Sequence, residues 1–173
     1  MKLSDGAIVE GNRHVDEAER DRRIADFYAP YHAAIAHLAN TSLALGIAPV
    51  LLSIHTFTPV WRAVPRPWHC GVLWDRDDRL PRLLLDALRN AGDLVVGDNE
   101  PYTGRLEGDC LWQHGTRRGL AHAIIEIRQD LVADAAGQEQ WAARLSGIMS
   151  EIFADASQKT ALQRQIDVPN TSG

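Results

Sequence analysis

Four short apolar runs, separated by amphipathic stretches, constrain the fold of this chain more than any other feature. The runs occupy residues 48–57, 69–75, 93–98 and 121–131. Each has the length and composition of a strand, and residues 48–57 and 69–75 are predicted to be buried strands. Helical periodicity predicts helices over residues 15–28, 31–45, 79–90 and 138–153, with Pro30 interrupting the first pair. Strands that alternate with helices indicate an α/β fold around a mostly parallel sheet.

The length of 173 residues suits one compact domain with its own core. We expect residues 1–14 to form an entering loop, because they are polar and show no period. Residues 15–155 are predicted to form the single α/β domain. The polar composition of residues 156–173 predicts a frayed tail.

Composition excludes several partners and sites. The formal net charge of -5 argues against a nucleic acid or an anionic membrane as partner. No apolar run approaches the ~20 residues of a membrane-spanning helix, and the first ten residues contain no signal peptide, so we expect a cytoplasmic protein. Cys70 and Cys110 are too few for a disulfide scaffold and are interpreted as small core residues.

Two polar residues inside apolar runs are candidates for chemistry, because ligands bind beyond the carboxyl ends of strands in open α/β sheets. His55 ends such a run, where it is either a metal ligand or a hydrogen-bonded core histidine. Glu126 lies between Ile125 and Ile127, where burial would raise its pKa towards that of a general base. The alternatives for Glu126 are a structural pair with Arg128 or a strand face open to solvent.

A turn-rich segment, residues 96–106, offers polar groups for a substrate. Asn99, Tyr102 and Arg105 are its candidates, and Arg105 could clamp a carboxylate. The alternative is a solvated loop. His114 and His69 are ambiguous by themselves. The sequence contains neither a phosphate-binding glycine fingerprint nor a nucleophile elbow.

Three segments resemble the N-formylglutamate amidohydrolase family, and the resemblance as a whole covers roughly residues 10–150. They are ERDRRIADFYAPYHAAI, LLSIHTFTPVWRAVPRPWHCGVLWDRD and VVGDNEPYTGRLEGDCLWQHGTRRGLAHAIIEIRQDL. The family is similar in fold to the zinc carboxypeptidases. The resemblance therefore implies a three-layer α/β sandwich around a mostly parallel or mixed sheet, phosphorylase/hydrolase-like. It also implies hydrolysis of the amide of an N-formyl or N-acyl amino acid.

The resemblance implies a role for each matched residue. His55 matches the strand-end histidine that binds the metal, which is expected to be Zn²⁺, and Glu126 matches the general base. Five further residues match positions near the substrate: Asn99, Tyr102, Arg105, His114 and Arg128.

The chain also departs from the family pattern. Family members carry an upstream strand that supplies a histidine and an acidic residue to the metal, and residues 1–14 contain nothing similar. The resemblance therefore implies an N-terminally truncated fold that lacks its first strands and two of three protein ligands. The alternatives are a non-catalytic remnant that binds an acyl amino acid, or a fold completed by a homo-oligomer or a partner chain.

Overall fold

The computed structural model describes residues 3–4 and 7–167. The chain divides into two compact units, Met1–Asn40 and Thr41–Gly173. Parts of the expected entering loop and tail, residues 1–2, 5–6 and 168–173, lie outside the described residues.

The first unit contains a small hairpin and a long helical segment. Its elements are β1 (Leu3–Ser4), β2 (Ala7–Ile8), a 3₁₀ turn (Glu10–Asn12), α1 (Glu17–Arg23), a π-helical turn (Ile24–Tyr28) and the first part of α2 (Ala29–Ala44). Asp16 caps α1 by accepting the Glu19 N–H at 2.8 Å. Pro30 was expected to interrupt the helix, but the π turn and α2 run straight into each other. Pro30 is the second residue of α2, and a wider preceding turn tolerates its missing N–H there.

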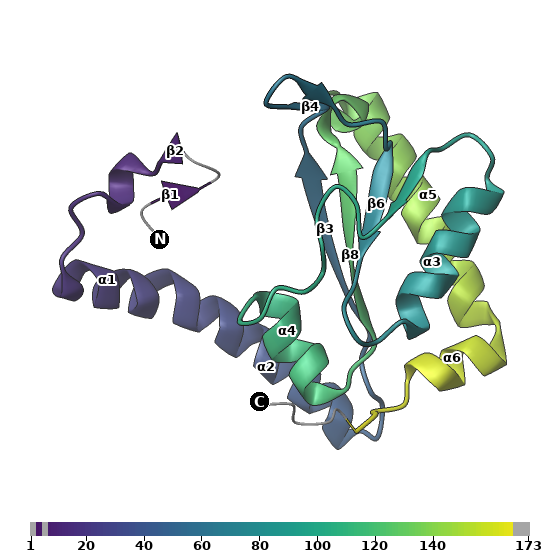
Figure 1. The fold of residues 1–173 in the computed structure, drawn as a ribbon. Helices are drawn as coiled ribbons and strands as arrows, with labels where there is room; N and C mark the ends of the chain where they lie inside the picture. The colour runs from purple at the N-terminus through teal and green to yellow at the C-terminus, as the bar shows by residue number, and fades with distance from the viewer. Residues whose placement is uncertain (1–2, 5–6, 168–173) are drawn as a thin grey trace. The chain divides into compact units, whose positions relative to one another are not determined.

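The second unit is built on a mixed four-stranded sheet, which confirms the predicted α/β class (Figure 1). Its strands, in spatial order, are β3 (Leu51–Phe57), β8 (His122–Arg128), β6 (Cys70–Leu73) and β7 (Val96–Asp98). β3 runs parallel to β8, and β6 runs parallel to β7 but antiparallel to β8. A short hairpin, β4 (Val60–Trp61) and β5 (Val64–Pro65), follows β3.

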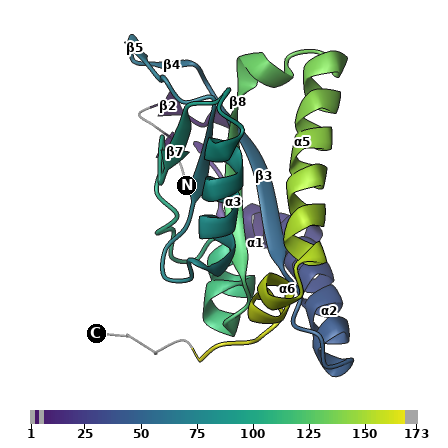
Figure 2. The same cartoon turned by 90° about the vertical axis from the view of Figure 1, so that its right-hand side faces the viewer.

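One face of this sheet is covered by α3 (Arg79–Asn90) and α5 (Ala135–Ala154), which lie side by side (Figure 2). Leucines spaced along one side of α3 and Trp141 and Leu145 of α5 pack against Val72 and Ile125. Asp134 caps α5 by accepting the Gly137 N–H at 2.8 Å. This face therefore holds the hydrophobic core. No helix in the described part of the chain is long and apolar enough to cross a membrane.

The opposite face is covered at one end by the short helix α4 (Cys110–His114). Leu111 of α4 packs with Leu51, Leu73 and Ile124. Strand alternation places Glu126 on this same face, two residues beyond Ile124. The carboxyl-terminal half of β8 thus lies past the part of this face that α4 covers.

The C-terminal segment differs from the expectation of a frayed tail. It forms α6 (Ala156–Leu162), and the Leu162 side chain is fully buried in the core. The Arg79 guanidinium, paired with buried Asp77, donates to the carbonyls of Ala161 and Arg164. The Ile166 N–H donates to the Gly119 carbonyl at 3.0 Å. Burial of one leucine and backbone hydrogen bonds to a distant arginine hold this polar segment, and neither is visible in its composition.

Candidate active site

Four residues form a row across the open face of the sheet. His55 of β3 is the register partner of Glu126 on β8. Glu126 is in turn opposite Gly71 on β6, and Gly71 is opposite Gly97 on β7. Register partners on neighbouring strands point to the same side of a sheet. The row therefore carries an imidazole and a carboxylate at one end and two positions without side chains at the other.

Glu126 is a buried carboxylate with one unsatisfied oxygen. Its side chain is 6% exposed, and among the described residues no donor reaches its buried Oε2 atom. Burial raises the pKa of Glu126 above its ordinary value, while electrostatic interactions with His55 and Arg66 act in the opposite direction. A native protein rarely leaves such an atom without a partner. This carboxylate is therefore poised to accept a proton or a ligand.

His55 lies beside this carboxylate but faces solvent. Its Nδ1 atom is 3.6 Å from Glu126 Oε1, and its side chain is 56% exposed. β3 is the edge strand of the described sheet, since its only strand neighbour there is β8. The sequence analysis placed His55 and Glu126 in two separate apolar runs, and the structure makes them register partners on adjacent strands. The metal-binding role of His55 and the general-base role of Glu126 remain predictions.

Two glycines allow a loop to lie flat against the row. A Cβ atom on Gly71 would lie 1.8 Å from the carbonyl oxygen of Glu100, and one on Gly97 would lie 2.7 Å from the same atom. A glycine inside a strand often marks such a close backbone approach. The loop that follows β7, residues 99–106, thus covers the β6–β7 side of the row and leaves the His55–Glu126 side to ligands.

Asn99 holds this loop in place. Its backbone has a φ of 53°, in the left-handed region that asparagine tolerates better than most residues. Its side-chain Oδ1 accepts the N–H of Trp74 at 2.9 Å and that of Gly104 at 3.0 Å. The predicted substrate contact of Asn99 is untested, and the structure assigns its amide oxygen to the loop.

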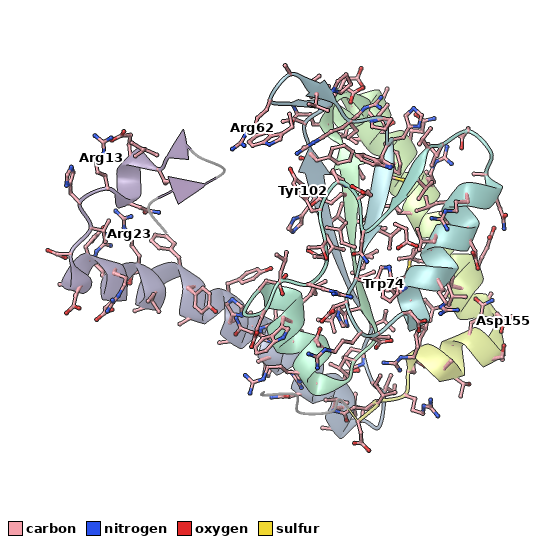
Figure 3. The ribbon with its side chains drawn as sticks, in the orientation of Figure 1. Arg13, Arg23, Arg62, Trp74, Tyr102 and Asp155 are labelled. Atoms are coloured by element: carbon pink, nitrogen blue, oxygen red, sulfur yellow. The ribbon has the colours of Figure 1, made fainter. Side chains whose placement is uncertain are left out.

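Tyr102 connects the loop to the β4–β5 hairpin. Its hydroxyl accepts a hydrogen bond from Arg66 Nη1 at 3.0 Å, and the Arg66 guanidinium lies 5.0 Å from the centre of its ring. Figure 3 labels Tyr102 beside the end of β3. The predicted substrate residue Tyr102 therefore lies near the carboxyl end of the strand that carries His55.

The two predicted arginines both have carboxylate partners. Arg105 Nε lies 3.4 Å from Asp75, and the Arg105 side chain is 79% exposed. Arg128 donates through Nε and Nη2 to Asp130 at 2.7 and 3.1 Å, and this pairing holds the pKa of Asp130 below its usual value. Arg128 shares the face of Glu126, as expected from its spacing, but it pairs with Asp130. Its role near a substrate remains a prediction.

His114 lies elsewhere in the second unit. It is the last residue of α4 and is buried, and the next residue, Gly115, packs against the ring of His122. His122 begins β8, whereas Glu126 lies four residues further along the strand. The predicted substrate role of His114 is untested.

Cys70 is fully buried, and burial raises the pKa of its thiol to about 12, which fits the interpretation of a core residue.

The side chains of His55 and Glu126 are of the kinds that bind zinc, but they are too few to form a complete zinc site. Imidazole nitrogen and carboxylate oxygen are both zinc ligands, and the unsatisfied Oε2 atom of Glu126 is consistent with a nearby cation or metal-bound water. Catalytic zinc sites use three protein ligands. Within the described residues, no group of three histidine, cysteine or carboxylate ligand atoms includes His55. A zinc ion at His55 would therefore need further ligands.

Comparison with known proteins decides the family. The family model described as N-formylglutamate amidohydrolase matches residues 1–133. The chain belongs to the N-formylglutamate amidohydrolase family. No curated protein sequence matches it.

Two solved structures resemble this family member. A gene product of Agrobacterium tumefaciens matches with a TM-score of 0.81 and 31% identity, over 91% of this chain and 62% of that one. An N-formylglutamate amidohydrolase from Ralstonia eutropha matches with a TM-score of 0.51 and 26% identity, over 69% of this chain and 45% of that one. The chain thus spans less than two thirds of the length of either protein.

Sequence reasoning missed three residues of this candidate site. Arg66, Gly71 and Gly97 were not among the candidates. For Gly71 and Gly97 the available signal was a glycine within an apolar run. For Arg66 the signal was an arginine between Pro65 and Pro67 in a loop rich in tryptophan, because a restrained loop can fix a guanidinium against aromatic rings.

Proposed function

We propose that the chain carries the general base and one metal ligand of an enzyme that hydrolyses the amide of an N-formyl or N-acyl amino acid. The observation that carries this proposal is the buried, half-satisfied Glu126 carboxylate beside the exposed imidazole of His55. Family membership and the N-formylglutamate amidohydrolase structure from Ralstonia eutropha support the choice of substrate.

In the proposed reaction, ionised Glu126 takes a proton from a water molecule as the water oxygen attacks the acyl carbon. The carbon–nitrogen bond then breaks, and Glu126 returns the proton to the leaving amine. The products are the carboxylic acid and the free amino acid. A zinc ion held by His55 would polarise the carbonyl and lower the pKa of the water. The raised pKa of Glu126 makes its carboxylate a stronger base for taking the proton from water.

The test is to measure zinc content and formate release from N-formyl-L-glutamate as zinc is added. The variant His55→Ala should bind less zinc and release less formate. His37→Ala is the control, because His37 is an exposed histidine of α2 in the other unit. A chain that binds almost no zinc and releases no formate would contradict the proposal.

A second candidate is a binding protein, or a fold that a partner chain completes. Two observations favour it: His55 lies in no three-ligand group of the described residues, and Ile54 of edge strand β3 is 56% exposed. An uncovered edge strand is a template for a further strand. Stabilisation against heat by N-formyl-L-glutamate that survives both a chelator and Glu126→Gln would support binding without catalysis.

A further inference from the structure

Arg66 has an unusually restrained side chain at the rim of the candidate site. It follows the β4–β5 hairpin, and its guanidinium lies near three aromatic rings, at 5.8, 5.4 and 5.0 Å from the centres of Phe57, Trp61 and Tyr102. Its Nη1 atom donates to the Tyr102 hydroxyl at 3.0 Å and to the Thr58 hydroxyl at 3.3 Å. Rings and hydrogen bonds together fix the plane of the guanidinium.

The other edge of this guanidinium is unused. Nε and Nη2 donate to no residue in the described part of the chain, and no carboxylate there pairs with Arg66. By contrast, Arg105 lies against Asp75 and Arg128 donates twice to Asp130. Of these three arginines, Arg66 is therefore the one whose Nε–Nη2 edge faces no carboxylate among the described residues.

The position of Arg66 relates it to Glu126. Phe57, one of its ring neighbours, is two residues beyond His55 and on the same face of β3. Tyr102, another neighbour, belongs to the loop that covers Gly71 and Gly97. The positive charge of Arg66 also acts on the Glu126 carboxyl. Arg66 thus lies at the carboxyl ends of β3 and β8, where ligands bind in open α/β sheets.

We propose that the Nε–Nη2 edge of Arg66 binds the α-carboxylate of an acyl amino acid, an inference that rests on the proposed function for the substrate class. A planar fork matches a carboxylate with two parallel hydrogen bonds. The α-carboxylate is attached to the carbon that bears the amide nitrogen. It is therefore the carboxylate that must lie nearest the reacting bond, and Arg66 lies against Phe57 at the end of the strand that carries His55.

The test is calorimetric titration of the full chain with two ligands, N-formyl-L-glutamate and the same molecule with its α-carboxylate replaced by a carboxamide. The wild type should bind the carboxylate ligand about tenfold or more tightly than the carboxamide. Arg66→Met should bind the two ligands equally, and Arg66→Lys should retain only part of the preference. Arg82→Met is the comparison and should keep the preference unchanged, because Arg82 is an exposed residue of α3 that pairs with Asp78.

The ratio of the affinities for the two ligands separates the loss of the Arg66 guanidinium from a general loss of structure. If Arg66→Met fails to fold, Tyr102→Phe serves instead: it keeps the ring, removes the hydroxyl that orients Arg66, and should reduce the preference several-fold. Equal preference in wild type and Arg66→Met, or no binding of either ligand by the wild type, overturns this inference. Arg66-dependent binding without formate release would support it while contradicting the proposed hydrolysis. Formate release by the wild type, with the same ligand preference in Arg66→Met, would support the proposed hydrolysis and contradict the inference about Arg66.

Discussion

His55 and Glu126 are direct register partners on adjacent parallel strands, with the imidazole Nδ1 3.6 Å from the carboxylate Oε1. The histidine faces solvent at the sheet edge, while the glutamate is buried and leaves one oxygen without a donor among the described residues. A charge in such a position is costly for the fold unless a ligand uses it. The pair therefore has consequences for stability as well as for chemistry.

Replacing Glu126 by glutamine should stabilise the folded protein at neutral pH. Burial raises the pKa of Glu126 above its ordinary 4.5, so the folded protein holds this proton more tightly than the unfolded chain does. The stability that the protonated group contributes is complete below pH 4.5 and is lost as pH rises through the folded pKa. We expect Glu126→Gln to gain on the order of 1 kcal/mol at pH 7, with the gain vanishing near pH 4. Urea unfolding at both pH values measures this, and an equal difference at both would contradict it.

Gly71→Ala should displace the loop over the sheet. The added Cβ would lie 1.8 Å from the Glu100 carbonyl oxygen, a contact that only backbone movement can relieve. We expect a loss of about 1–3 kcal/mol in the free energy of unfolding. Gly147→Ala is the matched control, because Gly147 lies within α5 with nothing within 4 Å of its Cβ position. It should gain about 0.5–1 kcal/mol. Equal effects of the two substitutions would refute the close approach.

Asn99 should act through its side-chain oxygen. Asn99→Ala removes the acceptor for the Trp74 and Gly104 N–H groups and should cost about 1–3 kcal/mol. Asn99→Asp keeps an oxygen in this position and should lose less. Hydrogen exchange of these two amides measures the effect locally. If Asn99→Ala left both amides as protected as in the wild type, the proposed anchoring would be wrong.

Arg79→Met should release the C-terminal segment. It removes the donors to the Ala161 and Arg164 carbonyls and leaves buried Asp77 without its partner. We expect a cost of about 3–5 kcal/mol and faster proteolysis within residues 156–167. Arg82→Met is the control, since Arg82 pairs with Asp78 at an exposed position. Unchanged cleavage in Arg79→Met would show that Leu162 burial alone holds the segment.

Local patterns in the sequence were enough to predict the sheet and its polar residues. The apolar runs around His55 and Glu126 became β3 and β8. A strand buried on both faces is apolar along its length, which accounts for β8, whereas β3 is apolar although residues 54–56 are exposed at the sheet edge. The order of strands and the antiparallel pairing of β6 with β8 depend on contacts between distant segments. Periodicity within one segment carries no information about such contacts.

Other features depended on tertiary contacts that composition does not encode. The segment after Asp155 is polar, yet one leucine and the carbonyl hydrogen bonds to Arg79 give it a helix and a place in the core. Pro30 sits within α2 because the chain widens into a π turn before it. Arg66 matters through the rings of Phe57 and Tyr102, which lie 9 and 36 residues away in the sequence.

Glu126 is proposed as the base of an amide hydrolysis. This role is tested most directly by measuring formate release from N-formyl-L-glutamate by the wild type and by Glu126→Gln, at the same zinc concentration. Both proteins have the same His55 and the same loop, so they differ only in the group that can take the proton. We predict zinc-dependent release by the wild type and a loss of at least about 10²-fold in Glu126→Gln. Equal rates in the two proteins, or no release by the wild type at any zinc concentration, would contradict the account.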